Sequence, residues 1–145
     1  MQINTYDAFS RLTPLQIDGL TKFIHKHQIE DNARETDIRR AIRYASKEVP
    51  GFGGIVYTAE EDGMLIGAIV MNRTGLEGSL PEQLVVSIAV HREHRDSTVY
   101  RKMLNYVVDY SCGDIGVQVK KDNPLVPVLE DHGFKNDYIQ MNLKQ

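Results

Sequence analysis

The most constraining feature of this sequence is a pair of apolar, β-branched segments joined by a short polar turn. Residues 54–59 read GIVYTA, residues 64–71 read MLIGAIVM, and Glu60-Glu61-Asp62-Gly63 lies between them. An aspartate followed by glycine favours the tight turn of a β-hairpin. A third apolar segment, residues 84–90 (LVVSIAV), is continuous enough to predict a strand buried on both faces. A chain of this kind builds its core around a sheet.

Helical patterns flank these strands on both sides. Thr13 followed by Pro14 predicts a helix start, because threonine is a good N-cap and proline suits the first helical position. A second helix is expected over residues 36–49, where apolar residues recur at helical spacing. A third helix carries the apolar stripe of residues 99–108, and a fourth opens at Asn123-Pro124 and closes at His132-Gly133.

Three weaker strands complete the expected architecture: one within residues 1–9, one over residues 115–119 and one over residues 138–143. The order is then β-α-α-β-β-β-α-β-α-β. Hairpins come first and strand-helix-strand units follow, so the sequence predicts a mixed α/β sheet. No repeat or linker divides the chain, and we expect a single domain over residues 1–145.

Charge and cysteine content narrow the classes of partner. The net charge is −3, so the chain is not expected to present the extended basic surface that binding to nucleic acid requires. The single cysteine, Cys112, excludes an intramolecular disulfide and fits a reducing compartment. The first residues lack a signal-peptide pattern and no apolar run is long enough for a membrane span, so a cytoplasmic location is expected.

Two segments resemble the GNAT (GCN5-related) N-acetyltransferase superfamily. LVVSIAVHREHR is similar to the family's central strand and the start of its acetyl-CoA loop, I-A-V-x-P-x-x-R-G-x-G-x-G. DNPLVPVLEDHGF is similar, without a gap, to the later segment D/N-N-x-A-x-x-L-Y-x-x-x-G-F. The hairpin followed by the loop at residues 72–75 also lies in the matching place, and the resemblance is best over residues 54–143.

The resemblance implies a GNAT-like α/β fold, with a mixed central sheet, two N-terminal helices and two further flanking helices. It implies an acyltransferase that moves an acetyl group from acetyl-CoA, as co-substrate, to an amine. The amine, on a small molecule or a peptide, would attack the thioester directly in a ternary complex. Acetyl-CoA would lie in the cleft between the central strand and the strand at residues 115–119. Neither nucleic acid nor a membrane is an expected partner, and a homodimer is expected to be possible, as is common in this fold.

The resemblance also assigns roles to residues. The phosphates of the cofactor would be held by one loop and the helix start after it: Arg95, Asp96, Ser97, Thr98, Val99, Tyr100. Asn123 would contact the pantetheine arm. The thioester carbonyl would be polarised by backbone N–H groups of the central strand: Ile88, Ala89, Val90. Glu82 would accept the proton of the amine through water, although a solvated loop glutamate is the alternative.

Four positions depart from the family pattern. Asp96, Thr98 and Tyr100 stand where the family has small residues, and Leu129 stands where it commonly has a tyrosine acid. A carboxylate near a pyrophosphate is unfavourable, and a large side chain restricts the approach of the backbone. The alternative for this loop is structural, with Asp96 or Ser97 capping the helix and Tyr100 covering its first turn.

These departures keep a second function open, namely a GNAT-like domain that binds a ligand or a protein partner without acetyl transfer. Asn123 is also a good N-cap residue before Pro124, so two interpretations stay open for it: a cofactor contact and a helix cap.

Histidines are concentrated near the same loop. His94 is a candidate base or anion contact, but the H-x-x-H spacing of His91 and His94 lacks a third ligand, so no metal is expected. His25 and His27 lie on or beside a polar helical face and are expected to be solvated.

Overall fold

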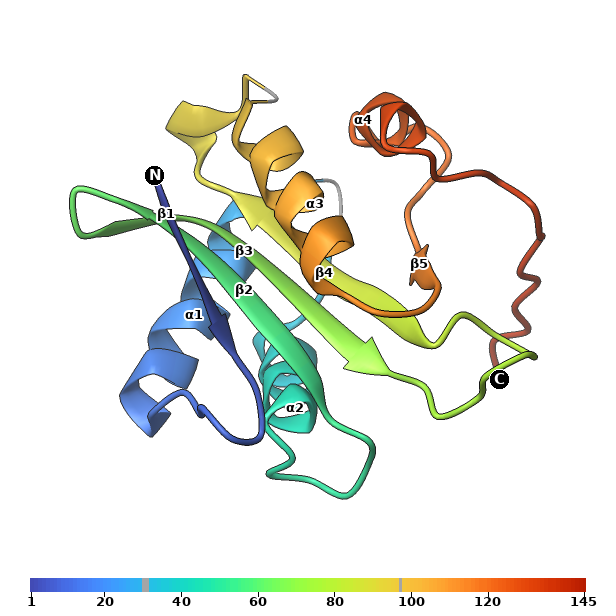
Figure 1. Cartoon of the computed structure of the whole chain (residues 1–145), viewed down its shortest axis with the longest axis horizontal. Helices are drawn as coiled ribbons and strands as arrows, with labels where there is room; N and C mark the ends of the chain where they lie inside the picture. The colour runs from blue at the N-terminus through green and yellow to red at the C-terminus, as the bar shows by residue number, and fades with distance from the viewer. Residues whose placement is uncertain (30–31, 97) are drawn as a thin grey trace.

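A computed structural model describes residues 1–29, 32–96 and 98–145 of the chain. Its sheet has the order β1-β2-β3-β4-β5, and the first four strands are antiparallel while β5 runs parallel to β4 (Figure 1). The sequence prediction of a mixed α/β sheet is confirmed. The strand bounds are β1 (Gln2–Tyr6), β2 (Gly54–Glu61), β3 (Met64–Arg73), β4 (Gln83–Val90) and β5 (Ile115–Val117).

Helices cover both faces of the sheet (Figure 1). One face carries α1 (Pro14–His27) and α2 (Glu35–Ala45), and the other carries α3 (Thr98–Tyr110) and the short α4 (Val126–Asp131). The alternation of strand side chains produces these two layers. Val56 and Ala89 belong to the α1/α2 cluster, whereas their neighbours Tyr57 and Val90 belong to the α3/α4 cluster.

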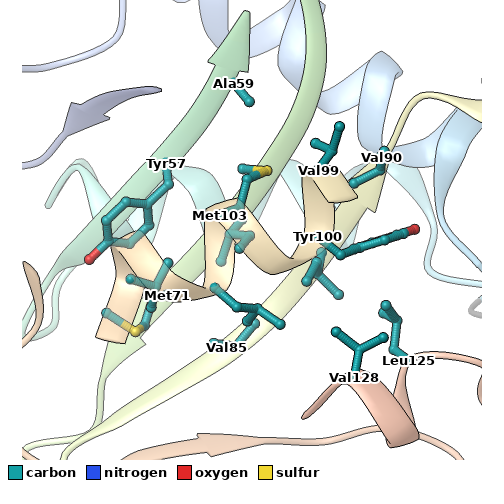
Figure 2. Packing of buried hydrophobic residues seen from close by; sticks show 14 of the residues in the cluster. Tyr57, Ala59, Met71, Val85, Val90, Val99, Tyr100, Met103, Leu125 and Val128 are labelled. Atoms are coloured by element: carbon teal, nitrogen blue, oxygen red, sulfur yellow. The ribbon is translucent and has the colours of Figure 1, made fainter. Parts of the chain in front are cut away.

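The α3/α4 cluster is the larger apolar layer. Figure 2 shows side chains of α3, among them Val99 and Met103, packed over Tyr57, Met71 and Val85 of the strands. Every one of these five residues is at most 7% exposed. This packing fixes α3 against the sheet, and therefore fixes where the start of α3 lies relative to β4.

Local sequence signals account for several boundaries. The Thr13 hydroxyl accepts the N–H of Gln16 at 3.1 Å, and the Gln16 side chain accepts the N–H of Thr13 at 2.8 Å, which is a capping box at the start of α1. In the β2–β3 hairpin, Asp62 and Gly63 have φ angles of 53° and 77°. Both are positive, as a tight hairpin turn requires.

Some sequence predictions were wrong. No strand forms over residues 138–143, because the segment has no neighbouring strand to pair with. The second helix was predicted to run to residue 49 but ends at Ala45. Two residues later Lys47 has a φ angle of 59°, which is incompatible with a continuing helix. The fourth helix begins at Val126, after a turn at Pro124 and Leu125.

Among the helices of the described residues, none combines the length and the apolar character that a membrane crossing requires.

Candidate functional site: a cleft where two parallel strands part

The site begins with a β-bulge in the middle of β4. Val70 of β3 lies opposite Ser87, but the next residue, Met71, lies opposite Val85, so Val86 has no partner across the ladder. A bulge bends its strand and increases the local twist. The parallel pairing of β4 with β5 ends at Val85 and Val117. The two strands therefore part at the bulge.

A cavity of about 370 Å³ occupies the space beside the bulge. One wall is β4, the second is the segment after β5, and the third is the end of α1 with the segment after it. The lining residues are Ile24, Gln28, Asn32, Ala33, Val86, Ser87, Ile88, Gln118, Val119 and Lys120. The lining combines apolar side chains with amides, one hydroxyl and one ammonium, and in ligand pockets such polar groups fix the orientation of a ligand held by the apolar surface.

The three backbone positions predicted to polarise a carbonyl have different surroundings. Ile88 lines the cavity. Ala89 forms an isolated antiparallel bridge with Gln28, so the chain after α1 covers this part of β4. The Val90 carbonyl accepts a hydrogen bond from Arg95 Nε at 3.2 Å. The strand backbone beside the cavity is therefore that of residues 86–88.

The start of α3 already holds an anionic group of its own. Asp96 Oδ1 accepts the Thr98 N–H at 3.2 Å, so Asp96 acts as the cap that the structural alternative predicted. Both residues are exposed, whereas Val99 is buried in the α3/α4 cluster. Ser97 lies outside the described residues. A pyrophosphate at this helix end would meet the Asp96 carboxylate.

Arg95 makes two internal hydrogen bonds. Its Nη2 donates to the His27 carbonyl at the end of α1, and its Nε donates to the Val90 carbonyl at the end of β4. The guanidinium thus ties α1 to β4. Cations near a helix C-terminus are favourable because the last carbonyls lack partners within the helix. The structure places Arg95 beside the expected phosphate loop, but with two of its donors committed elsewhere.

Tyr100 is buried in the first turn of α3, close to Arg95 of the predicted phosphate loop. Its ring packs in the α3/α4 cluster, to which Leu125 and Val128 also belong (Figure 2). The residue is 3% exposed, and its hydroxyl has no hydrogen-bond partner among the described residues. Burial raises the pKa of Tyr100 to about 12, although the charge of the nearby Arg95 acts in the opposite direction. Tyr100 is thus a buried packing residue beside Arg95, as expected in the alternative in which it covers the first turn of α3.

The structure does not bring Glu82 into the cavity. Glu82 precedes β4, and its carboxylate lies against Gly113, where an added Cβ would be 1.8 Å from Oε2. Along the strand it is about 13 Å from Val86, at about 3.3 Å per residue. Leu129, in the position of the family's tyrosine, is 5% exposed and packs in the core.

Asn123 uses its side chain within the protein. Its Oδ1 accepts the Leu125 N–H at 2.9 Å, and its Nδ2 donates to the Ile29 carbonyl at 3.4 Å. The residue is 3% exposed. Asn123 is not the N-cap of α4, because the helix begins only at Val126 with Leu125 at the cap position. Its contacts instead stabilise the turn before α4 and join this turn to the segment just after α1.

Several residues that line the cavity were not predicted as site residues, above all Ser87, Gln118 and Lys120. One signal was present, since Ser87 is the single polar residue within the apolar segment 84–90. The resemblance placed the cleft beside residues 115–119 but gave no role to Gln118 or Lys120, because these side chains reach the cavity only through the pairing of β5 with β4.

A cluster of three histidines, His27, His91 and His94, lies near the end of α1 and the segment after β4. The ring centroids of His27 and His91 are 4.4 Å apart, and those of His91 and His94 are 5.9 Å apart. His27 is 3% exposed and its Nδ1 accepts the Arg92 N–H at 3.3 Å, so the prediction that His27 is solvated was wrong. Burial, followed by the neighbouring His91 and then cationic side chains, lowers the pKa of His27 to about 4. Among the described residues, no group of three or more histidine, cysteine or acidic side chains is arranged to hold a metal ion.

Comparison with known proteins gives a uniform result at the level of fold. No protein-family model and no curated protein sequence matches the chain. Solved structures do match. A possible acetyltransferase from Clostridium difficile 630 superposes with a TM-score of 0.70 at 13% identity, covering 100% of this chain and 99% of that one.

Two further solved structures extend this similarity. A GNAT family acetyltransferase from Staphylococcus aureus subsp. aureus USA300_TCH1516 has a TM-score of 0.64 at 12% identity, with 100% of each chain covered. A predicted acetyltransferase with acetyl-CoA from Clostridium acetobutylicum has a TM-score of 0.62 at 15% identity, covering 97% of this chain and 95% of that one.

Proposed function

We propose that this chain, whose fold is that of the GNAT acetyltransferases, transfers an acetyl group from acetyl-CoA to an amine. The observation that carries the proposal is the cavity where β4 and β5 part at the Val86 bulge. One of the solved structures with this fold is an acetyltransferase described with acetyl-CoA.

The proposed position of the acyl chain follows from strand pairing. A pantetheine arm is extended and carries two amides, so it can pair with strand edges as a β-strand does. The segments 86–88 and 118–120 supply such edges on opposite sides of the cavity, since the β4–β5 pairing ends before them. A backbone N–H in this region, near Ile88, would polarise the thioester carbonyl.

Proton transfer has to use different groups from those predicted. Among the described residues that line the cavity there is no carboxylate, histidine or tyrosine. We therefore propose that water accepts the proton of the attacking amine. The Ser87 hydroxyl would donate a hydrogen bond to the acyl oxygen or to the leaving thiolate. Without a positioned general acid, the expected rate is about 10²- to 10⁴-fold lower than with one.

The proposal is tested by titrating acetyl-CoA into the purified protein in a calorimeter. The unmodified protein is compared with a variant in which a large side chain fills the cavity. Val86 lines the cavity and is 46% exposed, so Val86→Trp should fill the space without disturbing the core. We expect micromolar binding to the unmodified protein and at least a tenfold, or about 1.4 kcal/mol, loss in the variant.

Val108→Trp is the matched control, because Val108 is 42% exposed on α3 and does not line the cavity. Its affinity for acetyl-CoA should equal that of the unmodified protein. Equal binding to the Val86→Trp variant would remove the cavity from the proposal, and no binding to the unmodified protein at millimolar acetyl-CoA would remove acetyl-CoA itself.

A second candidate function rests on the Asp96 carboxylate at the start of α3. That group satisfies a helix N–H which a phosphate would otherwise use, and it repels an incoming anion. With Leu129 in place of an acid, this observation favours a GNAT-fold domain that binds a ligand or partner without acetyl transfer.

Asp96→Asn separates the two functions. Asparagine retains the oxygen that caps the helix but removes the charge, so CoA affinity should rise about three- to tenfold at low salt, and less at high salt. The control is Asp109→Asn, which removes the same charge near the other end of α3. An affinity for CoA that is unchanged by Asp96→Asn would show that phosphate does not bind at this helix start.

A further inference from the structure

A second pocket adjoins the cavity beside the Val86 bulge. It has a volume of about 500 Å³, and its walls come from the end of α1, the segment that leads into α2 and the segment after β4. Gln28, Asn32 and Ala33 line both spaces, so the two are neighbours. A small molecule bound in the cavity can therefore place one of its groups in the second pocket.

Positive charge is concentrated in this second pocket, which we call the basic pocket. Lys26, Arg34 and Arg92 line it, and the described lining residues include no carboxylate. Arg34 pairs with Asp37 at 3.2 Å, whereas Lys26 and Arg92 form no ion pair within the described part of the chain. The protein as a whole carries a net charge of −3, so this local excess of cations does not follow from its composition.

Stabilisation of a helix end does not account for all three cations. Lys26 lies in the last turn of α1, where a cation is favourable. Arg34, however, is at the N-cap position of α2, where the helix dipole disfavours a cation. Arg92 Nη2 donates to the Lys26 carbonyl at 3.4 Å, and its other side-chain donors have no partner among the described residues. Cations from three segments thus converge on one pocket with donors to spare.

We propose that the basic pocket binds a carboxylate or phosphate group of the acceptor, whose amine lies in the neighbouring cavity. This inference rests on the proposed acetyl transfer and adds the class of acceptor, a small primary amine with an acidic group a few atoms away. Arginine and lysine are the side chains that bind both of these anions. The amine nitrogen bonds to the thioester carbonyl carbon, the C–S bond breaks, the thiolate leaves as CoA, and the amine proton passes to water.

The first test compares four short amines in NMR titrations of the unmodified protein. O-phosphoethanolamine and β-alanine carry an anion, ethanolamine is their uncharged counterpart, and ethylenediamine carries a second amine. Both anionic amines should bind at least tenfold more tightly than ethanolamine, and less tightly as salt is raised, whereas like charge should exclude ethylenediamine. The tighter of the two anionic amines identifies the preferred anion. Ethanolamine binding as tightly as both of them would overturn the proposal, as would no binding of either at about 10 mM.

The second test removes the charge of the pocket. Lys26→Gln with Arg92→Gln should weaken binding of O-phosphoethanolamine at least tenfold. The matched control is Arg40→Gln with Arg43→Gln, which removes the same charge from exposed positions of α2 that line neither space. The control should stay within about threefold of the unmodified protein. Equal losses in the two variants would reduce the effect to net charge and overturn the proposal, once circular dichroism has shown both to be folded.

Acetyl-CoA separates this inference from the proposed function. The variant with Lys26→Gln and Arg92→Gln should bind acetyl-CoA as the unmodified protein does, and a lost affinity would assign the pocket to the cofactor phosphates and overturn the proposal. Anion-selective amine binding without acetyl transfer would support the basic pocket and overturn the proposed function. Acetyl transfer to ethanolamine and O-phosphoethanolamine with equal kcat/KM would support the proposed function and overturn the acceptor class.

Discussion

Replacing Leu104 with alanine is expected to lower the free energy of unfolding by about 3 to 4 kcal/mol. Leu104 lies in α3, is 0% exposed, and belongs to the cluster that joins α3 to the sheet. Removing a buried leucine side chain loses its transfer free energy and leaves a cavity that the surrounding side chains fill only in part. Chemical denaturation followed by circular dichroism measures the change.

Val108→Ala is the matched control for this substitution. Val108 lies one turn further along α3 but is 42% exposed, so its truncation should cost less than about 1 kcal/mol. If the two variants lost equal stability, the packing of α3 described above would be wrong. If both were as stable as the unmodified protein, the α3/α4 cluster would contribute little to the fold.

Acidification between pH 7 and pH 4 is expected to remove about 3 kcal/mol of stability through His27 alone. The pKa of His27 is lowered to about 4 in the folded protein, against an ordinary value of 6.5. The unfolded chain therefore binds more protons at this site between these two values. Stability from the neutral imidazole is complete above about pH 6.5 and decreases as the pH falls toward 4. Below pH 4 both states are protonated and the contribution of His27 no longer changes.

The measurement is the free energy of unfolding as a function of pH for the unmodified protein and for His27→Gln. Carboxylates also titrate in this range, so the informative quantity is the difference between the two curves. That difference should be constant above pH 7 and change by about 3 kcal/mol down to pH 4. His25→Gln, which alters an exposed histidine on the same helix, should give a curve parallel to that of the unmodified protein. A constant difference for His27→Gln would contradict the burial of a neutral imidazole.

The two ends of the proposed cofactor site differ in how well they match acetyl-CoA. At the acyl end, the bulge at Val86 and the early end of the β4–β5 pairing open a cavity. At the phosphate end, Asp96 caps α3 and Arg95 is committed to two carbonyl groups. The exposed Asp96 carboxylate is therefore the group that most directly opposes phosphate binding at this helix start, whereas Tyr100 is buried beside Arg95. This is why the Asp96→Asn measurement discriminates between an enzyme and a binding domain.

Local signals in the sequence were sufficient for the order of the main strands and helices up to α4 and for the mixed α/β class. The Asp62-Gly63 turn, the Thr13 cap and the apolar periodicities depend on residues within a few positions of each other, so they can be interpreted without a fold. The same locality explains the error at residues 138–143. Alternation predicts a strand there, but a strand also requires a partner, which alternation does not supply.

Only the tertiary structure decided the site. The cavity exists because β4 gains one residue relative to β3 and loses its pairing with β5 at the same point. The buried His27 imidazole accepts a hydrogen bond from the Arg92 N–H, 65 positions away, and the Asn123 amide donates to the Ile29 carbonyl, 94 positions away. Contacts over such separations are set by how whole strands and helices pack, and no short segment of the sequence contains that information.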